Sequence, residues 1–82
     1  MNILITGVTS GFGKQIALDL VKAGHQVIGT GRRQSKLNEL KDELGEGFTP
    51  LCFDVRDTQG ARQVLHSVNL SDIDVLINNA GL

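Results

Sequence analysis

A glycine-rich stretch, TGVTSGFG at residues 6–13, comes directly after a short apolar run and directly before residues with helical periodicity. Its three glycines lie within seven residues, and no acidic residue follows until Asp19. The first N–H groups of a helix have no partner within the helix and carry a partial positive charge, so they attract phosphate. The stretch therefore predicts a phosphate-binding loop, with a merely tight strand-to-helix connection as the alternative.

Each glycine of this stretch has a distinct role if it binds a phosphate. Gly7 would let the chain turn sharply off the strand, because glycine adopts backbone conformations that other residues avoid. Gly11 would let a pyrophosphate approach the backbone, since it has no Cβ. Gly13 would let the following helix pack closely on the sheet.

Hydrophobic periodicity divides the chain into short apolar runs that alternate with longer amphipathic stretches. The short runs predict strands at residues 3–6, 26–30, 48–53 and 74–78. The longer stretches predict helices at residues 12–23 and 35–44, and a third that starts at Asp57 or Thr58.

Glycine, serine and proline indicate how these elements end or pair. Gly24 and Gly45 stand where the first two helices are expected to stop. Ser35 is expected to cap the start of the second helix with its hydroxyl. Pro50 has no N–H to give to a neighbouring strand, so the third strand is expected at or near a sheet edge.

The order β-α-β-α-β-α-β predicts an α/β fold, because parallel strands are joined by right-handed crossovers that contain helices. The expected strands are continuously apolar, as burial on both faces of a sheet requires. We therefore expect part of a Rossmann-type doubly wound parallel sheet. In such a sheet a ligand binds beside the carboxyl ends of the strands, where the glycine-rich stretch would lie.

Two adjacent arginines, Arg32 and Arg33, follow the second expected strand. Dinucleotide-binding folds that take NAD place an acid near the end of this strand, whereas an arginine nearby accommodates the 2′-phosphate of NADP. The corresponding position here is Gly31, which has no carboxylate. A guanidinium can bind a phosphate through two parallel charge-assisted hydrogen bonds. The pair therefore predicts NADP as the cofactor, with a solvated turn as the alternative.

The spacing of the glycine loop, TGxxxGxG, resembles that of the short-chain dehydrogenase/reductase family. Two more motifs similar to those of the family follow later strands: Asp54-Val55 after the third, and Asn78-Asn79-Ala80-Gly81, like the NNAG motif, after the fourth. The resemblance covers the whole chain. It implies a strand order of 3-2-1-4 and an NADP(H)-dependent oxidoreductase that transfers hydride to or from a small-molecule alcohol or ketone.

The resemblance also implies roles for individual residues. Asp54 would accept a hydrogen bond from the adenine amino group, and the Val55 N–H would bond an adenine ring nitrogen; the alternative for Asp54 is a turn carboxylate. The backbone of Phe12 is expected to contact the phosphates. The alternative for its side chain is a position in the hydrophobic core. The full set of expected cofactor-binding residues is Gly7, Thr9, Ser10, Gly11, Phe12, Gly13, Arg32, Arg33, Asp54, Val55, Asn79, Ala80 and Gly81.

Within the family, the stretches GFG, GHQVIGTGRR, LKDELG and FDVRD look most like bacterial NADP-dependent 3-hydroxy acid dehydrogenases, which oxidise serine or allo-threonine-type substrates. The family's hydride transfer needs a Ser, a Tyr and a Lys that lie beyond the fourth strand, and this chain contains no Tyr. The resemblance therefore implies that residues 1–82 are the N-terminal part of a Rossmann NADP-binding domain, truncated before its catalytic half and inactive alone. The alternative is a non-catalytic nucleotide-binding or oligomerising Rossmann fragment.

Composition restricts the partners and the location. A net charge of −1 and a pI near 6.0 give no sign of nucleic acid or an anionic membrane as a partner. No apolar run approaches the roughly 18–20 residues that span a bilayer. The single cysteine, Cys52, cannot form an internal disulfide, so we expect a cytoplasmic protein. We also expect the longer enzyme to be a homo-oligomer, and we expect no metal site among these 82 residues.

Overall fold

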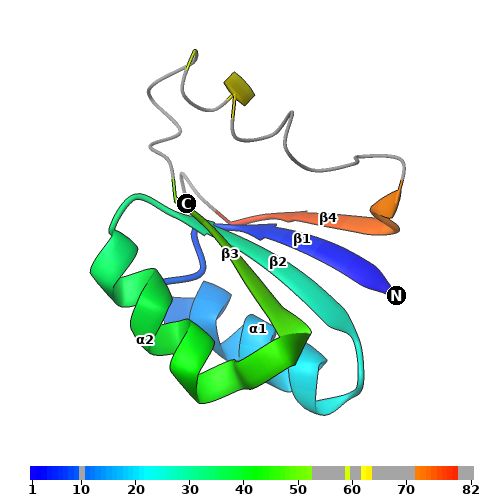
Figure 1. Cartoon of the computed structure of the whole chain (residues 1–82). Coiled ribbons are helices and arrows are strands. Elements are labelled where there is room, and N and C mark those ends of the chain that lie inside the picture. The colour runs from blue at the N-terminus through cyan, green and yellow to red at the C-terminus, as the bar shows by residue number, and fades with distance from the viewer. Residues whose placement is uncertain (10, 53–58, 60–61, 64–71, 80–82) are drawn as a thin grey trace.

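The computed structural model describes residues 1–9, 11–52, 59, 62–63 and 72–79 (Figure 1). Up to residue 52, strands and helices alternate as the sequence predicts. In chain order the elements are β1 (Asn2–Thr6), α1 (Gly11–Lys22), β2 (Gln26–Gly31), α2 (Gln34–Leu44), a 3-10 turn (Gly45–Gly47), β3 (Phe48–Cys52) and β4 (Val75–Asn78).

The four described strands form one parallel sheet in the order β3-β2-β1-β4. Ile3 lies beside Val27 on one side and beside Val75 on the other, which fixes the register of the three neighbouring strands. The expected order 3-2-1-4 and the Rossmann-like fold class are confirmed. Pro50 lies in β3 at the edge of the sheet, as its missing N–H predicts.

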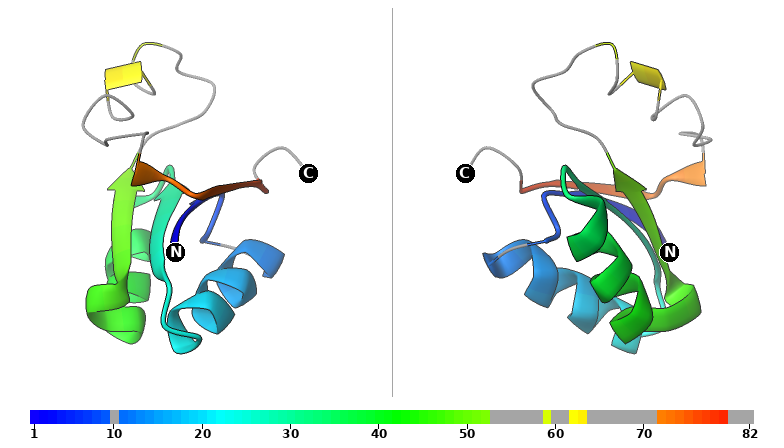
Figure 2. Two further views of the ribbon diagram at one scale, coloured as in Figure 1. Left: turned by 90° about the vertical axis from the view of Figure 1, so that its right-hand side faces the viewer. Right: turned by 60° about the vertical axis from the view of Figure 1, so that its left-hand side comes forward.

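The two described α-helices, α1 and α2, cover the same face of the sheet, as the two views of Figure 2 show. The core lies between the helices and this face. Alternate residues of each strand point to this face, where the helices cover them. The centre of the core therefore consists of apolar side chains that are almost fully buried. They are Ile3, Ile5, Val8, Ala17, Val27, Leu37, Leu40, Leu44 and Phe48.

Glycines end both helices, as expected. Gly24 has φ 93° and Gly45 has φ 75°, a left-handed region that favours glycine. The prediction that Ser35 caps α2 is wrong. Arg33 is the residue at the N-cap, and its carbonyl accepts the first helical hydrogen bond from the Leu37 N–H at 3.1 Å. The helix thus begins one turn before the buried Leu37, and Ser35 lies inside it.

The helix expected after Asp57 or Thr58 lies mostly among residues that the structure does not describe. Within the described ranges, no helix is long and apolar enough to cross a membrane. In β4, at the other edge of the sheet, Leu76 is 62% exposed.

Candidate dinucleotide-binding site

The glycine-rich loop runs from the carboxyl end of β1 to the first residue of α1. Gly7 has φ 69° and Gly11 has φ 54°, so both adopt the left-handed conformation that L side chains rarely take. The first of these turns the chain off the strand, and the second starts the helix. The predicted role of Gly7 in a sharp turn is confirmed.

Thr30, near the end of β2, holds the loop through two of its groups. Its hydroxyl Oγ1 accepts a hydrogen bond from the Gly7 N–H at 3.2 Å, and its carbonyl accepts one from the Val8 N–H at 2.9 Å. Thr30 is 1% exposed and Val8 is fully buried. Because buried polar groups must find partners, this pairing fixes the path of the loop over the neighbouring strand.

Asn79, just after β4, holds the loop from the other side. Its side-chain Nδ2 donates to the Gly7 carbonyl at 2.9 Å, and its backbone N–H donates to Thr6 Oγ1 at 2.9 Å. A Cβ added to Gly13 would overlap the Gly7 carbonyl oxygen and lie 2.6 Å from Asn79 Nδ2. Gly13 therefore allows the close approach that the sequence predicts, and its direct neighbours are the loop and the end of β4.

The space in front of Gly11 is open. A Cβ built there would meet no atom within 4 Å, and the first turn of α1 contains no acidic residue. The N–H groups of this turn carry the positive end of the helix dipole. A diphosphate fits such a position, because backbone donors face it and neither side chain nor like charge excludes it.

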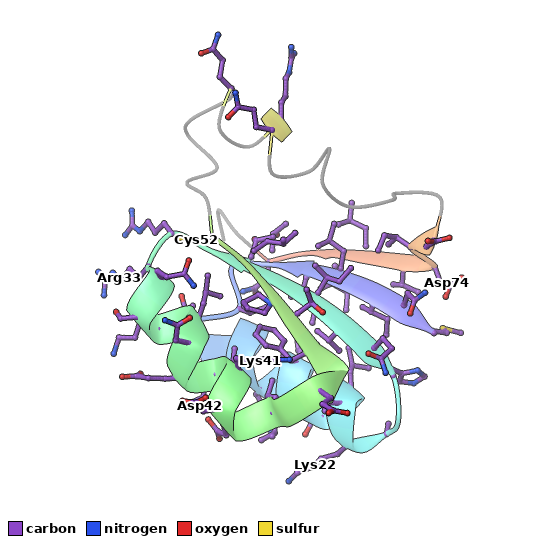
Figure 3. The ribbon with its side chains drawn as sticks, viewed as in Figure 1. Lys22, Arg33, Lys41, Asp42, Cys52 and Asp74 are labelled. Carbon is purple, nitrogen blue, oxygen red and sulfur yellow. The ribbon has the colours of Figure 1, made fainter. Side chains whose placement is uncertain are left out.

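Arg32 and Arg33 directly follow β2 and are exposed to solvent. Figure 3 shows Arg33 at the same end of the sheet as Cys52, whereas Asp74 lies at the opposite end. Since Cys52 ends β3, the arginines stand at the carboxyl edge where the glycine loop also lies. Neither guanidinium forms an ion pair or hydrogen bond with the residues that the structure describes, so both are available to an anion.

Thr9 and Phe12 differ in how they are placed. Thr9 is half-buried, and its methyl group faces Gly31. Phe12, in the first turn of α1, is 83% exposed, so its ring is not part of the core of this chain. The remaining expected contacts, Ser10, Asp54, Val55, Ala80 and Gly81, lie outside the described residues.

The contacts of Thr30 are not predicted from the sequence, and those of Asn79 differ from the prediction. Asn79 was expected among the cofactor-binding residues, whereas its side-chain amide donates to the loop. A contact between Asn79 and the cofactor stays a prediction. One feature of the sequence could have indicated Thr30: it is a hydroxyl-bearing residue near the carboxyl end of an apolar strand. That signal became meaningful only once the register placed Thr30 beside the turn at Gly7.

Comparison with known proteins agrees with this geometry. The family model of the short chain dehydrogenases matches residues 1–82. The chain is 48% identical over 84 residues to the NADP-dependent 3-hydroxy acid dehydrogenase YdfG of Escherichia coli O6:H1, covering 100% of this chain and 34% of that protein. It is 49% identical over 82 residues to the serine 3-dehydrogenase of Rhizobium radiobacter, covering 98% of this chain and 33% of that protein.

Among solved structures, the closed form of a serine dehydrogenase complexed with NADP+ matches with a TM-score of 0.91 and 46% identity. The match covers 100% of this chain and 34% of that one. The chain thus spans about a third of the length of the relatives it matches. Because the family model covers every residue and the glycine loop has the geometry described above, the chain belongs to the short chain dehydrogenase family.

Proposed function

We propose that this chain is the NADP(H)-binding part of an oxidoreductase that transfers hydride between NADP and a small hydroxyl-bearing substrate. Its relatives named above are NADP-dependent 3-hydroxy acid and serine dehydrogenases, which supports a 3-hydroxy acid as the substrate. The alternative of a non-catalytic Rossmann fragment is not favoured, because the relatives are dehydrogenases.

The observation that carries the proposal is the pairing of two anion-accepting features at one edge of the sheet. Gly11 opens the backbone at the start of α1, and Arg32 and Arg33 stand beyond the end of β2. The diphosphate would lie against the first N–H groups of α1. The 2′-phosphate would lie between the guanidinium groups, which bind phosphate in a fork geometry.

The nicotinamide would supply the hydride chemistry, and these 82 residues would supply coenzyme binding and orientation. The family's acid/base is a Tyr, which the chain does not contain. We therefore propose that the groups that bind the substrate and move its proton lie outside these residues. A homo-oligomeric enzyme and a cytoplasmic location are further proposals, since family resemblance and composition alone support them.

The test is the coenzyme preference of the natural full-length protein and its Arg32→Ala/Arg33→Ala variant, measured by calorimetric titration with NADPH and NADH. We expect the variant to lose at least about tenfold in NADPH affinity, because charge-assisted hydrogen bonds contribute about 1.5–3 kcal/mol each. Its NADH affinity should change little.

Lys22→Ala is a suitable control, because it removes a positive charge from the far end of α1 (Figure 3). It should leave both affinities unchanged. Equal losses for the two coenzymes in the double arginine variant would contradict the assignment of NADP. Oxidation of L-serine and other 3-hydroxy acids by the unmodified protein, followed as NADPH formation, tests the substrate class.

A further inference from the structure

We propose that Gly31 sets coenzyme choice by sterics, because Thr9 and Leu37 leave no room there for the carboxylate that NAD recognition uses. The inference rests on the proposed function and deepens it. It assigns a specificity role to a contact between the glycine loop and the end of β2, in addition to the charge of the arginines.

Gly31 is the last residue of β2 and is buried. A Cβ at this position would lie 2.9 Å from Thr9 Cγ2 and 3.3 Å from Leu37 Cδ2. Its φ is not positive, unlike that of Gly7 or Gly11. The conformation of the backbone therefore does not require glycine here. Glycine is favoured here because a Cβ would lie too close to Thr9 and Leu37.

Neither neighbour can move aside without consequence. Leu37 is fully buried in the core between α2 and the sheet. Thr9 belongs to the glycine loop, two residues after the turn at Gly7 that Thr30 holds. A side chain at position 31 must therefore shift Leu37 in the core or the Thr9 side chain on the loop expected to bind the diphosphate, because interiors are close-packed.

An aspartate at position 31 faces a second obstacle. Its Cβ would lie against the methyl groups of Thr9 and Leu37, so the carboxylate would be attached beside apolar groups that cannot replace the hydration of an ionised group. The ribose hydroxyls of NAD need this carboxylate as an acceptor at the end of the second strand. A single Gly31→Asp change should thus damage binding of both coenzymes and produce no preference for NADH.

The test is a set of variants of the natural full-length protein: Gly31→Asp, and Gly31→Asp combined with Thr9→Ser. Serine removes the methyl that blocks position 31 and keeps the hydroxyl. We expect Gly31→Asp to weaken NADPH binding about tenfold or more without a gain for NADH. The double variant should bind NADH about tenfold more tightly than Gly31→Asp does. An NADH gain in Gly31→Asp alone, or no gain on adding Thr9→Ser, would overturn the proposal.

A stability cycle covers the case in which Gly31→Asp does not fold. Gly31→Ala should lower the Tm by about 3–10 °C, and Thr9→Ser should restore part of that loss. Gly29→Ala is the matched control: it lies on the same strand, but its Cβ would meet Phe48 and Val8. Thr9→Ser should restore nothing there, and equal effects on both glycines would contradict the inference.

These Tm values do not depend on any coenzyme. If the unmodified protein bound neither NADPH nor NADH, the proposed function would fail by itself, and the Tm cycle would still decide whether Thr9 closes position 31.

Discussion

The loop after β1 and the turn after β2 lie at the same edge of the sheet and are held in very different ways. Gly7 and Val8 bond to Thr30, Asn79 bonds to the Gly7 carbonyl, and Gly13 admits the close contact between them. Arg32 and Arg33 are exposed and make no side-chain hydrogen bond to the described residues.

This difference suits the two regions to different tasks in the candidate site. A loop held by several part-buried hydrogen bonds is largely shaped before its ligand arrives, so binding costs little further ordering. Long exposed arginines lose side-chain freedom on binding, and their contribution is sensitive to salt. We infer that the loop determines whether a dinucleotide binds, whereas the arginines and Gly31 determine which one.

The largest effect is expected from Gly13→Ala. The added methyl would overlap the Gly7 carbonyl and crowd the Asn79 amide, so the loop cannot keep its path. We expect a loss of about 3 kcal/mol or more in the free energy of unfolding, together with weaker binding of NADPH and NADH alike. Urea unfolding and titration measure the two effects. Normal binding of both coenzymes by this variant would remove the loop from the site.

Thr30 gives a smaller and more selective test. Thr30→Val keeps the shape but leaves the Gly7 N–H without its acceptor, at a cost of about 1–3 kcal/mol in stability. Both coenzymes should bind more weakly. Thr30→Ser keeps the hydroxyl and should recover most of the binding affinity. If valine and serine behaved alike, the hydrogen bond to Gly7 would have no part in holding the loop.

The smallest effect on stability is expected from changes in the turn after β2. Arg32→Lys/Arg33→Lys keeps both charges and loses the planar fork, so NADPH affinity should fall by roughly threefold to tenfold. The unfolding free energy should change by less than about 0.5 kcal/mol, because both side chains are exposed. A large loss of stability would show that the turn is part of the framework, and the contrast between the two regions would disappear.

Local patterns in the sequence were sufficient for the framework. Continuous apolar runs and the intervening amphipathic stretches predict the strands and the first two helices, and Gly24, Gly45 and Pro50 behave as their chemistry dictates. The start of α2 was misplaced at Ser35, because capping preference is local while the buried Leu37 sets where the helix must begin.

Contacts across strands could not be predicted in the same way. The bond from Gly7 to Thr30 and the bond from Asn79 to Gly7 join residues far apart in the chain. The limit on side-chain size at Gly31 comes from Thr9 and Leu37 on two other elements. Such effects appear only when the register and the packing of the helices are known.

The most direct measurement is a crystal structure of the natural full-length protein with NADP+ bound. The account predicts the diphosphate within hydrogen-bonding distance of the backbone N–H groups at the start of α1, in front of Gly11. It also predicts the 2′-phosphate between Arg32 and Arg33, with Gly31 and Thr9 unmoved. A diphosphate bound elsewhere, or a 2′-phosphate that touches neither arginine, would contradict it.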